Sequence, residues 1–252
     1  MFAVIAGMIP IGFGSGPTSA SGAVAGAADL PTTTTNPVAR TDVPLDLSKI
    51  DLPLAFEENQ GQTDAEVDFL TRGSGYQVFL GSGDATIALG NGESGFAIRM
   101  DVVGAAAAPG LVPIAQQPAH VNYFIGDDPA GWQTKVPTFG AVEYRDVYPG
   151  IDLRYYGNDR QLEYDFIAQP GADPSQIALA FEGSTSLALS ETGDLEIGLN
   201  PGRTVTFSAP FTYQDTPVGR VVVESAYRLA DDTVTFALGG YDPAVPLIID
   251  PT

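Results

Sequence analysis

The sequence predicts an all-β fold, either one antiparallel β-sandwich-like domain or two packed β subdomains, preceded by a disordered N-terminal segment. Three observations support this prediction. Apolar and polar residues alternate in many short runs, as strands with one buried face require. Turns rich in Gly, Pro, Asn and Asp separate these runs at regular intervals. No long stretch has a helical period, and the absence of a fixed-length repeat argues against a propeller within this chain.

The predicted strands follow one another through residues 53–252. Gly-Ser-Gly at 73–75 and Thr-Gly-Asp at 192–194 are typical of the turns between them. Residues 111–119 are Pro-rich, and residues 132–150 are interpreted as a loop that holds the only tryptophan. Strands are expected at residues 67–71, 76–80, 87–89, 96–103, 120–125, 151–156, 162–167, 177–181, 187–189, 195–199, 205–207, 211–214, 221–229, 233–238 and 247–249.

The hairpin predicted over residues 151–167 is the clearest of these signals, because both of its runs alternate strictly. Between the runs stands Gly-Asn-Asp-Arg. Asn and Asp tolerate positive φ, so we expect a tight turn centred on Asn158-Asp159. This turn places Tyr155 opposite Leu162, and one face of the hairpin is then wholly apolar.

The polar face of that hairpin concentrates charge. The expected register sets Arg154 opposite Glu163, and it sets Asp152 opposite Asp165, where two carboxylates repel each other. Clustered charge is more often a structural ion-pair network than a site, so our first interpretation is that Arg154 neutralises all three acids. The alternative is a calcium ion held by Asp152, Glu163 and Asp165, since calcium takes oxygen ligands. A shifted register would remove the repulsion altogether.

The composition excludes several classes of function. Asp and Glu number 31 against 11 Lys and Arg, which gives a net charge of −20. Such a surface disfavours nucleic acid and anionic membranes as partners. The absence of Cys excludes disulfides and thiolate zinc sites, and the single His120 excludes multi-His metal sites. No Gly-x-Ser-x-Gly motif accompanies that histidine. We therefore expect neither an enzyme nor a resident cofactor, calcium excepted.

The N-terminal residues predict export. Residues 1–28 carry no charge, begin with an apolar run over 1–13, and offer small residues at Ala25, Ala27 and Ala28. We interpret them as an export signal that lacks its basic start, the alternative being a disordered low-complexity segment. Residues 29–52 form a Thr/Pro-rich linker. A secreted or cell-surface location is expected, with no membrane span in the mature chain.

Two groups of residues are candidates for ligand binding. The amide side chains in the Asn-Gln-Gly-Gln segment offer paired donors and acceptors that suit sugar hydroxyls. Aromatic residues near the tryptophan could form a sugar-stacking platform. For the amides the alternative is a polar loop that bonds its own backbone, and for the aromatics it is burial in the core. The candidates are Asn59, Gln60, Gln62, Trp132, Tyr144 and Tyr148.

The chain resembles the uncharacterised domain that precedes SBBP-type β-propeller repeats in exported bacterial and archaeal proteins. The resemblance covers nearly all of residues 52–251, and its most specific blocks are Asn-Gln-Gly-Gln at 59–62 and Tyr-Pro-Gly-Ile-Asp at 148–152. It implies no established activity. In similar proteins an Ile-Asp-Pro ending leads into propeller repeats, whereas this sequence ends one residue after that motif. A stand-alone version, or repeats in a separate reading frame, is expected.

Three functions follow from these observations. The first is an extracellular binding or adhesion module for a carbohydrate such as a cell-surface glycan, stiffened by calcium in one version of the hypothesis. The second is a structural cap or spacer for a β-propeller partner, which predicts an exposed apolar patch. The third, a two-carboxylate glycoside hydrolase, is disfavoured because directly opposed strand residues stand too close for that chemistry.

Overall fold

The structure is a computed structural model that describes residues 54–73, 75–90, 95–158, 161–200 and 202–251. Residues 51–252 form one compact unit. The export signal predicted for residues 1–28, the linker predicted for residues 29–52 and the expected N-terminal disorder lie outside the described ranges.

Antiparallel strands build the described part of the chain, which contains no α-helix, and this confirms the predicted all-β class. Two short 3-10 helices interrupt the strands, η3 (Pro129–Gly131) and η4 (Pro174–Gln176). The strands are β1 (Phe56–Glu58), β2 (Phe69–Gly73), β3 (Tyr76–Gly81), β4 (Asp84–Leu89), β5 (Phe96–Val102), β6 (Gly110–Tyr123), β7 (Gln133–Tyr148), β8 (Ile151–Asn158), β9 (Gln161–Ala168), β10 (Ala178–Glu182), β11 (Ser186–Leu189), β12 (Leu195–Leu199), β13 (Arg203–Phe207), β14 (Phe211–Thr216), β15 (Gly219–Val223), β16 (Ser225–Ala230), β17 (Thr233–Leu238) and β18 (Leu247–Asp250).

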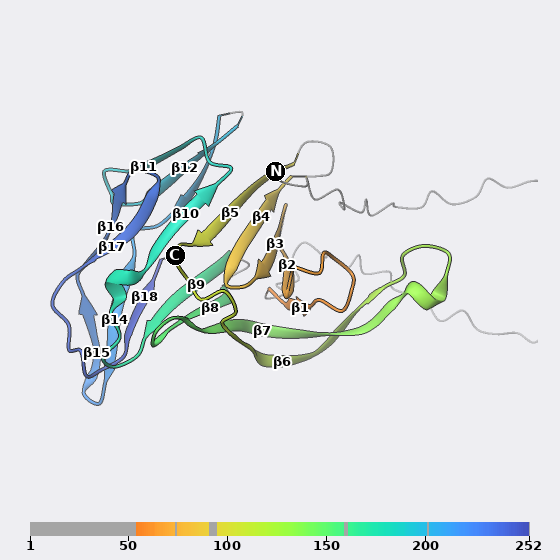
Figure 1. Ribbon diagram of the computed structural model, residues 1–252, viewed down its shortest axis with the longest axis horizontal. Coiled ribbons are helices and arrows are strands. Elements are labelled where there is room, and N and C mark those ends of the chain that lie inside the picture. Colours follow the sequence, from red (N-terminus) through yellow and green to blue (C-terminus); the bar gives the residue numbers. More distant parts are fainter. Residues whose placement is uncertain (1–53, 74, 91–94, 159–160, 201, 252) are drawn as a thin grey trace, which may run out of the picture. The chain divides into compact units, whose positions relative to one another are not determined.

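Most of these strands belong to one near-closed, barrel-like sheet (Figure 1). Within the described residues it holds 15 strands in the order β15-β14-β18-β9-β8-β7-β1-β2-β3-β4-β5-β10-β17-β16, with β6 paired to β7 beside this path. Its first and last strands, β15 and β16, follow each other in the chain with only Glu224 between them. Because these two end strands are consecutive in the chain, the two ends of the sheet lie near each other and the sheet is almost closed.

A single hydrophobic core spans this sheet and the smaller one formed by β11, β12 and β13. Phe207 of β13 makes edge-on ring contacts at 5.7 Å with Phe181 and at 6.0 Å with Tyr164. Edge-to-face aromatic pairs stabilise packing beyond the area that they bury. The continuous core favours one domain over two packed subdomains, and its main sheet is barrel-like rather than one layer of a sandwich.

Strands β6 and β7 correct the sequence interpretation of their region. Residues 133–148 were expected in a loop, yet they form β7, whose Val136 and Val142 are fully buried. Most of the neighbouring strand, β6, was not predicted as a strand because it contains Pro113 and Pro118. Proline cannot donate to a sheet and is tolerated at an edge. β6 is such an edge, because among the described strands it pairs only with β7.

The β8–β9 hairpin forms at the predicted place but in a different register. Asn158 pairs with Gln161 and Tyr155 pairs with Tyr164, a shift of two residues from the expected pairing. The residues between Asn158 and Gln161 are outside the described ranges. The predicted apolar face survives because side chains alternate with a period of two, so Ile151, Leu153 and Phe166 are all fully buried.

Candidate functional site

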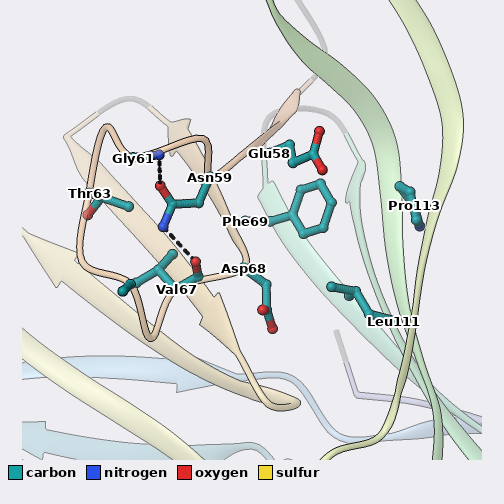
Figure 2. Close-up of a pocket in the computed structure, with 10 residues that line it drawn as sticks. Glu58, Asn59, Gly61, Thr63, Val67, Asp68, Phe69, Leu111 and Pro113 are labelled. Carbon is teal, nitrogen blue, oxygen red and sulfur yellow. Dashed lines mark hydrogen bonds between the residues drawn. The ribbon is translucent and has the colours of Figure 1, made fainter. Parts of the chain in front are cut away.

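A surface groove of about 560 Å³ lies between the loop that follows β1 and the first residues of β6. Figure 2 shows its two sides. Glu58, Asn59 and Asp68 lie on one side, with Phe69 at the centre. On the other side, β6 contributes the exposed Leu111 and Pro113. The groove thus combines one polar wall with one apolar wall.

The loop over residues 59–68 is held in shape by its own amide side chains. Asn59 donates from Nδ2 to the carbonyl oxygens of Asp64 and Val67, both at 2.7 Å, and its Oδ1 accepts from Gly61 N–H at 3.0 Å. Figure 2 shows the bonds to Val67 and Gly61. Gln62 donates to the carbonyl of Glu58 at 2.7 Å. These contacts match the alternative in which the amides bond the backbone, and they leave Asn59 without a free N–H for a ligand.

The remaining amide, Gln60, projects differently. Its backbone N–H donates to Gln62 Oε1 at 2.6 Å, while its exposed side chain reaches Glu58 Oε2 only at 3.5 Å. Because the loop satisfies most of its polar groups internally, its backbone is preorganised. A preorganised loop loses little conformational entropy when a ligand binds.

A glycine on β3 allows this loop to lie close to the sheet. A Cβ on Gly81 would stand 2.3 Å from the carbonyl oxygen of Glu66, which is backbone and cannot rotate away. The loop is also tied to the strand by the bond from Asp68 N–H to the Leu80 carbonyl, at 2.7 Å. The absence of a side chain at position 81 therefore sets the position of the polar wall.

Asp68 joins the groove to the core. Its Oδ2 accepts from the N–H of Ser82 and from the phenol of Tyr144, each at 3.1 Å. Ser82 has a φ of 54° in the β3–β4 turn, so the carboxylate supports a strained position. Burial, followed by the negative charge of Asp68, raises the pKa of Tyr144 well above its ordinary value, so the phenol stays protonated and donates.

The predicted aromatic platform is not assembled at the groove. Tyr144 is 1% exposed and reaches the groove only through Asp68. Tyr148 is 5% exposed, and its hydroxyl donates to the carbonyl of Val103 at 2.7 Å. Trp132 lies just before β7, where its indole N–H donates to the Gly126 carbonyl at 3.1 Å and its ring contacts Phe124 at 5.1 Å. Neither Trp132 nor Tyr148 lines the groove.

The acids of the hairpin separate in the observed register. Asp152 pairs with Ile167, and its carboxylate accepts from Asp146 N–H at 2.9 Å and from Gln169 at 3.2 Å. Glu163 pairs with Tyr156 and accepts from Asn158 at 2.9 Å. Within the described residues no three Asp, Glu or His side chains lie close enough together to hold a metal ion. Asp152, Glu163 and Asp165, the three candidate calcium ligands, therefore do not form such a group.

Within the described residues Arg154 donates no hydrogen bond to the hairpin acids, although its positive charge partly offsets the burial and the charge of Asp250 that raise the pKa of Asp165. Arg154 lies opposite Asp165, but it donates from Nε at 3.0 Å and Nη2 at 2.5 Å to Glu143 on β7. Burial alone would raise the pKa of Glu143, but hydrogen bonds from Arg154 and Arg145 outweigh burial, so the pKa is lowered. Both Arg154 nitrogens donate to one oxygen of Glu143, and Arg145 donates to the other. These bonds explain the difference, since Glu143 is 5% exposed and a buried carboxylate requires a charged partner.

Asp165 instead approaches another carboxylate. Ile249 on β18 pairs with Phe166, so the next position along both strands brings Asp250 beside Asp165. Burial and then the charge of Asp250 raise the pKa of Asp165 to about 6, although the Tyr156 hydroxyl donates to it at 3.1 Å. Burial, then the charge of Glu163, also raises the pKa of Asp250, and its buried Oδ1 has no partner within the described residues.

Sequence reasoning missed most of the groove. It proposed Asn59 from the correct loop, but it did not propose Glu58, Asp68, Leu111 or Pro113. The available signal for Asp68 was its place between Val67 and Phe69, because alternation turns an acid at that position to the face opposite its apolar neighbours. No local signal pointed to Leu111, which meets the loop only through the pairing of β6 with β7.

The fold and the groove define the class of this protein, an antiparallel all-β domain with a preorganised surface loop beside an edge strand. Residues 56–252 match the family described as "Domain of unknown function (DUF7948)". The chain belongs to that family. No curated protein and no solved structure matches it. None of the helices in the described ranges has the length and hydropathy that a membrane crossing requires.

Proposed function

We propose that the chain is a non-catalytic binding module of a secreted or cell-surface protein, and that the groove beside the 59–68 loop holds its ligand. The observation that carries this proposal is the rigid construction of the polar wall. Three internal bonds of Asn59 and the close approach of Gly81 to Glu66 fix the loop before any ligand arrives. Preorganisation of this kind lowers the entropic cost of binding.

The arrangement of the two groove carboxylates argues against glycoside hydrolysis. Glu58 pairs with Phe69 across the β1–β2 ladder, and Asp68 is the next residue along, so both acids belong to the same wall. Hydrolysis of a glycosidic bond requires two carboxyl groups on opposite sides of it. The facing wall offers Leu111 and Pro113 instead. This geometry supports binding rather than catalysis.

The uncharged apolar start of the sequence and the acidic composition support export. The resemblance to domains that precede SBBP-type repeats supports a place beside a β-propeller partner at the cell surface. Calcium does not enter this proposal as a resident ion, because the geometry of the hairpin acids gives no reason to invoke it.

A second candidate function, a structural cap for a partner domain, has one observation in its favour. The β14–β15 hairpin exposes four large apolar side chains: Phe211 is 40% exposed, Val218 94%, Val221 48% and Val222 62%. Exposed apolar side chains are typical of a docking surface. Val221 and Val222 are neighbours along β15 and point to opposite faces, so the candidate surface, the β14–β15 patch, is the hairpin as a whole. It lies on different strands from the groove, so the two candidates can be separated by mutation.

The experiment is a binding screen against glycans and short peptides with three proteins: the native chain, Leu111→Arg and Val218→Arg. A ligand of the groove is expected to bind the native chain and Val218→Arg but not Leu111→Arg. Both positions are exposed, so folding should be retained, and circular dichroism checks it. Binding that survives Leu111→Arg and is lost in Val218→Arg would move the function to the β14–β15 patch.

A further inference from the structure

The charged side chains that line the groove are all acidic. Of the residues that line it, Glu58 and Asp68 are acidic and none is basic. The loop between them adds Asp64 and Glu66, and again contains no Lys or Arg. Carboxylates that line a concave surface focus a negative potential there and attract cations from solution.

Both groove carboxylates have acceptor capacity to spare. Asp68 receives its two bonds on Oδ2, and no bond to Oδ1 occurs within the described residues. Among the residues that the structure describes, the side chain of Glu58 receives only the long 3.5 Å contact from Gln60. An ionised carboxylate can accept about four hydrogen bonds, so each can accept more from a ligand.

Two of the three buried glutamates of the described residues have arginine partners, while the third, Glu163, accepts from Asn158. Glu57, the neighbour of Glu58, is 6% exposed and bonds Arg72, and Glu143 bonds both Arg154 and Arg145. No ion pair with a basic residue involves Glu58 or Asp68 in the described part of the chain. Glu58 and Asp68 thus lack an internal cation within the described residues and are open to an external one.

The apolar wall specifies what should accompany that cation. Leu111, Pro113 and Val67 border the groove, and Leu111 is 39% exposed. Burying methylene groups against such residues removes apolar surface from water and so stabilises a complex. A bare metal ion has no apolar surface to bury against this wall. It also requires more oxygen ligands than two carboxylates supply.

We infer that the groove receives a basic side chain, lysine or arginine, presented by a partner protein. The ammonium or guanidinium group meets Glu58 and Asp68, while the aliphatic stem lies along Leu111 and Pro113. This inference rests on the proposed function, because it names the ligand of the same groove. It replaces a neutral glycan with a cationic peptide as the ligand class.

The test is a titration followed by NMR chemical shifts, with three matched peptides of the form acetyl-Gly-X-Gly-amide. X is lysine, arginine or norleucine, which is a neutral side chain with an aliphatic stem. We expect shifts at the groove with lysine and arginine, binding at least tenfold weaker with norleucine, and loss of affinity at high salt. Equal binding of norleucine and lysine would overturn the inference.

Single substitutions test whether the peptides bind in the groove. Glu58→Gln and Asp68→Asn remove one charge each with little change of shape, and each should weaken lysine binding about tenfold. Glu196→Gln makes the same charge change at an exposed position of β12 and should have no effect. If Asp68→Asn unfolds, Glu58→Gln and Leu111→Ser still test the groove. Lysine binding that none of the groove variants weakens would contradict the assignment.

Two further outcomes are informative. Butan-1-amine carries the same ammonium and stem without a peptide, and tighter binding of this amine than of the lysine peptide would overturn the protein partner in favour of a free amine. Groove-dependent binding of a neutral glycan, with no effect of lysine peptides, would refute the basic ligand while leaving the proposed binding function intact. If no ligand binds in a groove-dependent way, the proposed function fails as well.

Discussion

The phenol of Tyr144 donates a hydrogen bond of 3.1 Å to Asp68, a residue 76 positions earlier in the chain. Tyr144 is also the register partner of Leu111 across the β6–β7 ladder. One buried tyrosine therefore connects the two walls of the groove. Tyr144→Phe and Gly81→Ala test this connection and the loop that it supports.

Replacement of Tyr144 by phenylalanine keeps the packed ring and removes only the hydroxyl. Asp68 then retains the Ser82 bond alone, and we expect the free energy of unfolding to fall by about 1–2 kcal/mol. Urea denaturation measures the loss. Tyr241→Phe is the matched control, because the hydroxyl of Tyr241 has no hydrogen bond within the described residues. Equal effects of the two changes would mean that the bond to Asp68 contributes nothing.

Gly81→Ala should displace the 59–68 loop. The added methyl group would stand 2.3 Å from the Glu66 carbonyl oxygen, so the loop has to move outward, at a cost of about 1–3 kcal/mol. Gly240→Ala is the control, since a Cβ there meets no atom within 4 Å. Amide hydrogen exchange would report the change as faster exchange at Asp68, whose N–H bonds Leu80. Unchanged exchange would show that the loop does not depend on this glycine.

The carboxyl pair of Asp165 and Asp250 predicts stability that rises as the pH falls. The pKa of Asp165 is raised from 3.8 to about 6 by burial and by the charge of Asp250, so the folded chain binds this proton more tightly than the unfolded chain. Between about pH 7 and about pH 4 the folded state should gain up to about 1.4 kcal/mol per pH unit. Below that range, carboxyls with a lowered pKa, such as Glu143, become protonated and reverse the trend.

Thermal melts across this pH range measure the effect, and Asp165→Asn should flatten the profile. The exposed Asp232 provides the control, because Asp232→Asn removes a turn carboxylate that has no recorded partner in the described ranges. A profile that keeps its slope in Asp165→Asn would show that other groups take up the proton.

Calcium should leave the melting temperature unchanged. Asp152 and Glu163 have separate partners, and the hairpin register does not gather them with Asp165. A folded state that binds an ion is stabilised by it, so equal melting in excess calcium and in chelator is expected. A rise in calcium that disappears in Asp165→Asn would restore the calcium site that the sequence suggested.

The sequence predicted which residues form strands wherever alternation and turn chemistry agree. The register of the β8–β9 hairpin could not be predicted in this way. A shift of two residues leaves every side chain on its predicted face, so the apolar pattern cannot distinguish the two registers. The observed pairing, unlike the expected one, sets Arg154 opposite Asp165. The ion pair of Arg154 with Glu143, on the preceding strand, could not be read from the hairpin alone.

The groove was less accessible to prediction for a related reason. Its polar wall is local in sequence, and the Asn-Gln-Gly-Gln segment drew attention to it. Its apolar wall comes from β6, a strand that carries two prolines and an irregular register between Gln116 and His120. Propensity assigns such a segment to a loop. Only the tertiary pairing with β7 makes it a strand and brings it to the site.

The position of β18 has a consequence for how the molecule is made. This strand, Leu247–Asp250, is hydrogen-bonded between β9 and β14, although it is the last strand described in the chain. The central ladder therefore cannot close until residue 250 is available to it. Pairings between strands that are distant in sequence also form slowly, because a long loop must be closed first. We expect folding to be completed only after synthesis has delivered this strand, and the waiting chain to expose the unpaired edges of β9 and β14 to chaperones.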